Sequence, residues 1–272
     1  MRLRQLVLLL LFFLILPSCR MLERSFLYRP ASTKIAPESW RLPAESVQLP
    51  TPDGETLDAW WVPNSNLRGP VVLLLPGRRG FRSRHVPNLR VMWEAGASVL
   101  VLQYRGFGNS TGSPTEEGVI VDGTTAFDWL RGRVGDRPII VVGRSLGGAV
   151  AAQVALRRDV GGLVLESTFT SVPDMARRMI KIPGIQYFVA TAFDTVDALK
   201  RRDMPLVIIH GNEDTLVPIE MGYALLDAAS SAQKQFYEVR GASHWNTYYL
   251  AGNAYRDWVS AMAGSSCQTQ VC

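Results

Sequence analysis

The chain has 272 residues, of which 47% are hydrophobic and 19% charged, and this composition predicts one globular domain with a sizeable core. Its net charge is +5, but the basic residues form no stripe interleaved with aromatic residues, which excludes a nucleic-acid-binding protein. The three cysteines form neither a disulfide framework nor a metal-binding signature, so we expect no metal and no cofactor.

The N-terminus has the layout of an export signal, in which a basic start precedes the unbroken apolar run Leu6–Leu16. This run is short for a membrane-spanning helix. The residues that follow resemble a bacterial lipobox, in which Cys19 is lipidated; an uncleaved anchor or an ordinary signal peptide is the alternative. We therefore predict a signal peptide over 1–18, a tether over 19–45, and an exported protein anchored in the bacterial cell envelope, by analogy with lipoprotein sorting at the outer membrane.

Predicted strands and helices alternate through residues 46–262. The strands are predicted over 46–49, 57–62, 71–75, 97–103, 162–165, 206–210 and 234–239, with one more that starts at Ile139. The helices are predicted over 86–94, 115–131, 219–229 and 247–262, with one more directly after Ser145. This alternation predicts a mostly parallel central sheet of about eight strands with helices on both faces. Residues 166–203 break it and are predicted to form a small cap, and 263–272 form a polar tail.

The segment Gly143-Arg144-Ser145-Leu146-Gly147 lies where a β-branched strand meets a small-residue helix. In that context Gly-x-Ser-x-Gly is typical of a nucleophile elbow, which projects the serine hydroxyl above the edge of the sheet. Side chains two residues before and after the serine would collide with the helix or the neighbouring strands, so glycine fills both places. We therefore predict that Ser145 is a nucleophile.

A serine hydroxyl is a poor nucleophile at neutral pH and needs a base to take its proton. Among the three histidines, His244 lies in a loop after the last predicted strand and fits the chain order of nucleophile, acid and histidine. His210 ends a buried strand, where packing or a hydrogen bond in the core is expected, and His85 lies in an arginine-rich loop. His244 is therefore the predicted base.

The acid that orients the imidazole should lie on a loop after a buried strand. Asp214 follows the strand over 206–210 and is the predicted acid. Glu213 is the neighbouring alternative, and Glu166, at the end of the preceding strand, is the second.

Acyl transfer also requires hydrogen-bond donors for the developing oxyanion. The backbone N–H of Leu146, at the start of the helix after the serine, is one predicted donor. The backbone N–H of Arg78 is the other, because Gly77 allows a close approach of the loop after Leu75.

Several of these segments resemble motifs of the α/β-hydrolases, namely 104–110, 143–151, 211–218 and 241–244. More narrowly, they look like the abhydrolase-domain branch of small membrane-associated serine hydrolases, which includes bud-emergence-type and palmitoyl-protein thioesterase-like members; 27–30 is similar to their leader. The resemblance implies the α/β-hydrolase fold and a triad of Ser145, Asp214 and His244. The family usually has His-Gly-Asn where this chain has 76–78, a departure that bears on substrate preference.

These features predict a serine hydrolase that cleaves carboxylic ester, thioester or lipid acyl bonds through an acyl-enzyme on Ser145. We expect a monomer that acts on a small-molecule or lipid ester. An amidase or aminopeptidase with the same triad, or a non-catalytic membrane-tethered lipoprotein that binds a partner, are the alternatives. Arginines cluster at 78–84, 177–178 and 201–202. These clusters are either solvated surface or contacts with anionic lipid or an acidic substrate.

Overall fold

The computed structural model describes residues 21, 23–30 and 37–265. The predicted signal peptide over 1–18, the lipidation site Cys19 and most of the predicted polar tail lie outside the described residues. None of the described helices combines the length and the apolar character that a membrane span requires.

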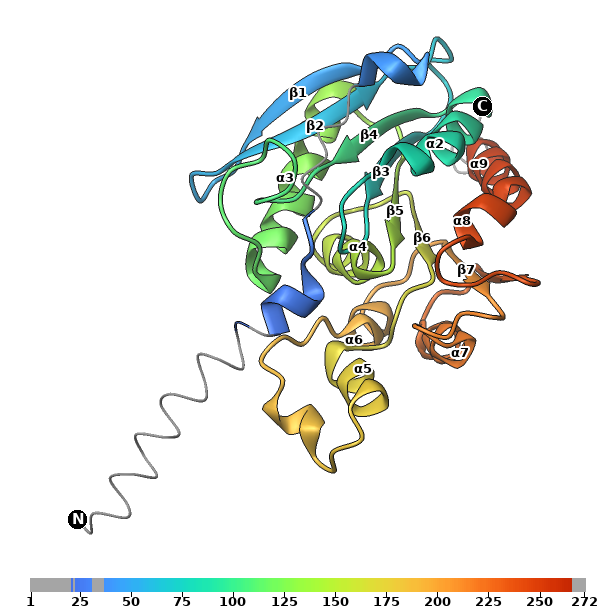
Figure 1. The fold of residues 1–272 in the computed structure, drawn as a ribbon. Helices are drawn as coiled ribbons and strands as arrows, with labels where there is room; N and C mark the ends of the chain where they lie inside the picture. The colour runs from blue at the N-terminus through green and yellow to red at the C-terminus, as the bar shows by residue number, and fades with distance from the viewer. Residues whose placement is uncertain (1–20, 22, 31–36, 266–272) are drawn as a thin grey trace.

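Eight strands form one sheet in the order β1-β2-β4-β3-β5-β6-β7-β8 (Figure 1). They are β1 Glu45–Pro50, β2 Thr56–Val62, β3 Val71–Leu75, β4 Ser98–Leu102, β5 Ile139–Arg144, β6 Gly162–Glu166, β7 Leu206–Gly211 and β8 Lys234–Val239. β1 and β2 pair antiparallel with each other, and β2 pairs antiparallel with β4. All the other pairs are parallel, as the alternation of strands and helices predicts.

The helices cover both faces of this sheet (Figure 1). They are α2 Val86–Glu94, α3 Glu116–Val134, α4 Leu146–Arg157, α5 Val172–Met179, α6 Thr195–Lys200, α7 Ile219–Ala228, α8 Thr247–Leu250 and α9 Gly252–Ser265, with short 3₁₀ turns η1 Pro37–Trp40, η2 Ser83–His85 and η3 Ile185–Phe188. Side chains of α3, α4 and α6 join one buried cluster, and side chains of α2 and α9 join another. Adjacent strand residues divide between the two clusters, since Trp61 packs in the first and Trp60 in the second.

Two helices depart from their predicted bounds by more than one residue. α3 continues past the predicted end at Arg131 to Val134 and stops at Gly135, which has a positive φ of 60°. The single helix predicted over 247–262 was wrong, because the chain leaves helical geometry at Ala251 (φ −83°, ψ 9°) and starts a new helix at Gly252. Glycine has low helix propensity, so the break falls where continuing the helix is least favourable.

The predicted cap segment contains α5, η3 and α6. α6 packs against α4 and α7, beside the face of the sheet. Two carboxylates hold the chain between η3 and α6. Glu23 accepts hydrogen bonds from the backbone N–H groups of residues 190 and 191, and Glu116, at the start of α3, accepts from those of residues 192 and 193.

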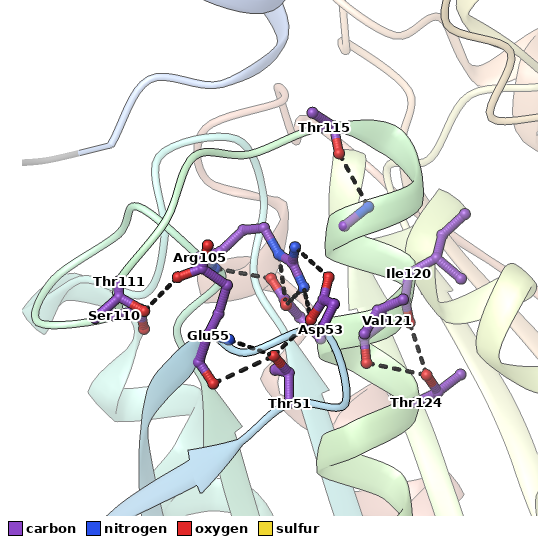
Figure 2. Close-up of polar contacts among 12 residues, drawn as sticks. Thr51, Asp53, Glu55, Arg105, Ser110, Thr111, Thr115, Ile120, Val121 and Thr124 are labelled. Atoms are coloured by element: carbon purple, nitrogen blue, oxygen red, sulfur yellow. Dashed lines mark hydrogen bonds and ion pairs between the residues drawn. The ribbon is translucent and has the colours of Figure 1, made fainter.

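Arg105, in the loop after β4, joins three segments that are far apart in sequence (Figure 2). Its Nε donates to Oδ1 of Asp122 on α3 at 2.8 Å, and its Nη1 donates to Oδ2 of Asp53 in the β1–β2 turn at 2.7 Å. The hydrogen bond from Arg105 lowers the pKa of Asp53 to about 2. Arg105 and Asp122 are both buried, and their ion pair fixes α3 against the carboxyl end of β4, while the pair of Arg105 with the partly exposed Asp53 fixes the hairpin.

Candidate active site

Ser145 lies between β5 and α4 in a strained backbone conformation, with φ 53° and ψ −120°. A positive φ is uncommon for a residue with a side chain and marks a position that the surrounding structure holds in place. The backbone N–H of Ser145 donates to the carbonyl of Glu166 at 2.8 Å, and its carbonyl accepts from Gly148 at 2.9 Å. Neighbouring β6 and the first turn of α4 thus hold the predicted elbow in position.

The glycines around Ser145 are required by close backbone contacts. A Cβ on Gly143 would come closer than 3.0 Å to the backbone of Gly147. A Cβ on Gly147 would come equally close to the carbonyl oxygens of Leu75 and Pro76. Since real Cβ atoms do not approach backbone that closely, any larger residue would push α4 away from β3 and β5.

Asp214 and His244 come together from loops that follow β7 and β8. Nδ1 of His244 lies 2.8 Å from Oδ2 of Asp214, and both side chains are buried. The other carboxylate oxygen, Oδ1, accepts hydrogen bonds from the backbone N–H groups of Leu216 at 3.0 Å and Val217 at 2.8 Å. The loop therefore fixes the carboxylate, which in turn orients the imidazole.

The other acids considered from sequence do not contact His244. Glu213 is exposed. Glu166 is buried at the end of β6, where it accepts a hydrogen bond from Arg144 Nε at 3.0 Å and another from the Tyr255 hydroxyl. Asp214 is therefore the acid that the structure places against the imidazole.

The other two histidines have different surroundings. His210 is fully buried, and its Nε2 contacts the carbonyl of Val217 at 2.8 Å, as expected for a histidine of the core. The same Nε2 of His210 lies 3.7 Å from Oδ2 of Asp214, so this carboxylate faces the imidazoles of both His210 and His244. His85 is buried beside the arginine-rich loop, where its Nδ1 accepts from the backbone N–H of Arg82 at 3.1 Å.

One cavity of about 20 Å³ brings Ser145 and His244 together with the loop after β3. The other residues that line it are Gly77, Arg78, Arg79, Gly80, Arg84, His85, Arg144 and Trp245. Among the described residues, no hydrogen bond joins the side chains of Ser145 and His244.

One predicted oxyanion donor belongs to Leu146, which follows Ser145, and the other to Arg78, which lines the same cavity as Ser145. Leu146 is the first residue of α4, so its N–H has no acceptor within the helix. The loop that carries Arg78 approaches closely, since a Cβ on Gly77 would lie 3.5 Å from Cβ of Ser145. Within the described part of the chain, neither N–H donates to a backbone acceptor outside the helices and strands. Both groups are therefore available to an anion.

Arg144 is a residue whose role sequence reasoning missed. Its side chain is largely buried, donates from Nε to Glu166, donates from Nη2 to the carbonyl of His244, and lies over the Tyr248 ring at 5.5 Å. Arg144 therefore links the elbow to the histidine loop. The signal in the sequence was a charged residue at the end of an otherwise apolar strand, immediately before the nucleophile.

The described residues contain no group of three His, Cys, Asp or Glu side chains that could hold a metal ion. A second hollow of about 550 Å³ shares no lining residue with the cavity at Ser145; it is lined by Ser39, Trp40, Arg41, Ser83, Val86, Pro87, Arg90 and Val91. It contains no histidine, so the smaller cavity is the one with groups suited to nucleophilic chemistry.

Comparison with known proteins agrees with this geometry. A sequence profile of the alpha/beta hydrolase fold matches residues 70–187. The chain is 32% identical to the alpha/beta hydrolase domain-containing protein WAV2 of Arabidopsis thaliana over 82% of this chain and 80% of that protein. It is 31% identical to the protein bem46 of Schizosaccharomyces pombe over 78% and 74% of the two chains.

Two further matches bear on activity and fold. The lysophosphatidylserine lipase ABHD12 of Danio rerio is 31% identical over 66% of this chain and 53% of that protein. The esterase Pf2001 of Pyrococcus furiosus superposes with a TM-score of 0.71 at 22% identity, over 88% and 98% of the two chains. At this identity the superposition establishes the fold alone. Together with the matches to WAV2 and bem46, these findings show that the chain belongs to the α/β-hydrolase family, in its abhydrolase-domain branch.

Proposed function

We propose that the protein is a serine hydrolase that cleaves carboxylic ester, thioester or lipid acyl bonds through an acyl-enzyme on Ser145. The observation that carries this proposal is the 2.8 Å contact between Asp214 and His244 beside the cavity that Ser145 lines. Because Nδ1 of His244 faces the carboxylate, Nε2 is the ring nitrogen left to exchange a proton with the serine. The strained elbow supports the nucleophilic role of Ser145.

In the first step, Oγ of Ser145 attacks the acyl carbon while Nε2 of His244 takes the hydroxyl proton. The carbonyl oxygen becomes an oxyanion, which the backbone N–H groups of Leu146 and Arg78 stabilise. The alcohol or thiol then leaves with the proton from His244. A water molecule, deprotonated by the same imidazole, attacks the acyl-enzyme and releases the acid, and Asp214 stabilises the imidazolium in both half-reactions.

The substrate class follows from the relatives rather than from the fold. ABHD12 is named a lysophosphatidylserine lipase, which supports a lipid acyl ester as one class of substrate. The predicted lipoprotein signal over 1–18, with Cys19, would hold the enzyme at a membrane of the cell envelope, where such esters occur. The proposed mechanism uses only groups of this chain and needs no cofactor.

A fluorophosphonate probe tests the proposal, because it reacts covalently with activated serines. The full-length chain in detergent should be labelled and should hydrolyse short and medium p-nitrophenyl esters. Ser145→Ala should abolish labelling and lower kcat by about 10³-fold or more. Ser65→Ala, which changes an exposed serine before β3, is the matched control and should behave like the unaltered protein. Labelling that persists in Ser145→Ala would refute the assignment.

A further inference from the structure

Four arginines line the cavity that contains Ser145. Arg78, Arg79 and Arg84 come from the stretch after β3, and Arg144 comes from the end of β5. Among the described residues, no carboxylate lines the same cavity. The wall around the nucleophile is therefore strongly cationic.

Two of these guanidinium groups are already engaged by the protein. Arg144 is paired with Glu166 at 3.0 Å and also donates to the carbonyl of His244. Arg78 donates from Nη1 to the carbonyl of Phe26 at 2.9 Å, and its guanidinium lies 5.0 Å from the centroid of the Phe26 ring. Both side chains are held in place by these contacts.

Arg79 and Arg84 are not neutralised. Arg79 lies over the ring of Trp245, 5.6 Å from its centroid, and Nε of Arg84 lies 3.4 Å from Nε2 of His85. Neither forms an ion pair with any of the described residues. Stacking on an aromatic ring leaves the N–H groups in the plane of a guanidinium free to bind an anion.

Concentrating like charges around one cavity is unfavourable unless an anion compensates them. Repulsion from neighbouring positive charges contributes to the lowered pKa values of two groups. Partial desolvation of the Arg84 guanidinium lowers its pKa, and the guanidinium groups of Arg144, Arg82 and Arg79 lower it further. Burial also lowers the pKa of His85 to about 3, again with help from neighbouring arginines. A negatively charged ligand at this wall would relieve the repulsion.

The size of the cavity determines where such a ligand would lie. At about 20 Å³ it holds little more than one water molecule, so it accommodates the reacting carbonyl and not the rest of an ester. The remaining parts of the substrate must lie at its rim. Arg84 is exposed and Arg79 half-buried, so both can reach a group outside the cavity.

We propose that the enzyme prefers esters that carry an anionic oxygen group, a carboxylate or a phosphate, and that Arg79 and Arg84 bind this group while the ester carbonyl lies at Ser145. This proposal rests on the proposed serine hydrolase function. It states that the preferred substrate is negatively charged and that two arginines of the 78–84 cluster determine this preference.

Two substrates with the same acyl group and nearly the same size but different charge provide the test. The full-length enzyme is assayed with 4-acetoxybenzoate, which is anionic, and with 4-acetoxybenzamide, its neutral counterpart with the same acyl group. Charge-assisted hydrogen bonds to guanidinium favour the anion, so kcat/KM for the benzoate should exceed that for the benzamide by about tenfold or more. Raising the salt concentration should reduce this ratio, since salt screens exposed charges.

Variants connect the preference to the two arginines. Arg84→Gln and Arg79→Gln should each lower the ratio of benzoate to benzamide kcat/KM by about fivefold to tenfold, mainly through KM. Arg84→Lys, which keeps the positive charge, should have a higher ratio than Arg84→Gln. Arg68→Gln removes an exposed positive charge before β3 and is the matched control, for which both rates should stay unchanged. Equal effects of Arg84→Gln and Arg68→Gln on the ratio would overturn the assignment.

Lipid substrates separate the two kinds of anion. Lysophosphatidylglycerol carries a net negative phosphodiester, whereas lysophosphatidylcholine with the same acyl chain has no net charge. A preference for the benzoate alone assigns the site to carboxylates, and a preference for lysophosphatidylglycerol assigns it to phosphates. No preference in either pair refutes the proposal.

Binding to the inactive variant makes this test independent of catalysis. Calorimetry with Ser145→Ala should show that 4-hydroxybenzoate binds about tenfold more tightly than 4-hydroxybenzamide. If fluorophosphonate labelling succeeds and no charge preference appears, the anion site is refuted while the hydrolase function stands. If labelling fails and the inactive variant still prefers the anion, the hydrolase function is refuted while the anion site stands.

Discussion

Asp214 holds His244 through a contact of 2.8 Å between Oδ2 and Nδ1, although the two residues lie in loops after different strands. We predict that Asp214→Asn lowers kcat for p-nitrophenyl esters by about 10³-fold to 10⁴-fold, because an amide no longer fixes the imidazole tautomer or stabilises the imidazolium. Steady-state kinetics across pH values check this. The binding of substrate should change much less than kcat.

Glu213→Gln is the control for that substitution. Glu213 is exposed and adjacent in sequence, and it was the neighbouring candidate for the acid. Removing its charge should leave kcat within about twofold of the unaltered enzyme, because it makes no contact with the imidazole. If Glu213→Gln lowered kcat as much as Asp214→Asn does, the assignment of Asp214 as the acid would be contradicted.

The packing of the elbow predicts that even a methyl group at Gly147 is harmful. Its Cβ would lie closer than 3.0 Å to the carbonyl oxygens of Leu75 and Pro76, which are backbone atoms that cannot rotate away. Gly147→Ala should therefore lower the free energy of unfolding by about 1–3 kcal/mol. It should also lower kcat/KM by about a hundredfold, because the start of α4 shifts relative to Ser145.

Gly132→Ala is the comparison for this substitution. Gly132 lies within α3, and a Cβ there would meet no atom within 4 Å. Alanine should raise the free energy of unfolding by about 0.5–1 kcal/mol, because it restricts the unfolded chain and favours helix. Urea unfolding of both variants measures the contrast, and equal stability of the two would argue against the close packing at the elbow.

The sequence alone was sufficient to predict the strands and the residues at their ends. β8 coincides with the predicted range 234–239, since turn residues bound an isolated run of strand-forming residues. Pairing of parallel strands then brings the ends of β5, β7 and β8 to one edge of the sheet, which is why Ser145 and His244 line the same cavity.

Features that depend on tertiary contacts could not be predicted in this way. Arg144 contacts Glu166 and the carbonyl of His244, and such a link between distant segments leaves no periodic pattern in the chain. The break between α8 and α9 was missed because the residues around Ala251 have ordinary helical composition apart from Gly252. The sequence also does not show which arginines around the cavity form an ion pair, because that depends on their neighbours in the folded chain.

The buried ion pair between Arg105 and Asp122 makes a prediction about stability. Arg105→Gln leaves the fully buried carboxylate of Asp122 without its cation, so the free energy of unfolding should fall by about 3–5 kcal/mol. Chemical denaturation measures the loss. Adding Asp122→Asn to this variant should recover part of it, because the uncompensated charge is then removed as well.

An exposed ion pair provides the control for that measurement. Asp197 on α6 and Arg201, directly after its end, form an i,i+4 pair, with side chains 53% and 62% exposed. Arg201→Gln should change the free energy of unfolding by less than about 0.5 kcal/mol, because solvent screens exposed pairs. Similar losses in Arg105→Gln and Arg201→Gln would contradict the view that the burial of Arg105 gives its ion pair a structural role.

The buried imidazole of His85 predicts how stability depends on pH. Burial, together with the charges of Arg144, Arg84 and Arg82, lowers the pKa of His85 to about 3, whereas the unfolded chain takes up this proton near pH 6.5. The unfolded state therefore binds more protons between these values, so the free energy of unfolding falls as the pH falls from 6.5 towards 3. His85→Gln removes this titration, and its stability curve should be shallower by up to about 1.4 kcal/mol per pH unit. Urea unfolding between pH 7 and 4 checks the difference, and parallel curves for the two proteins would show that His85 is not held neutral.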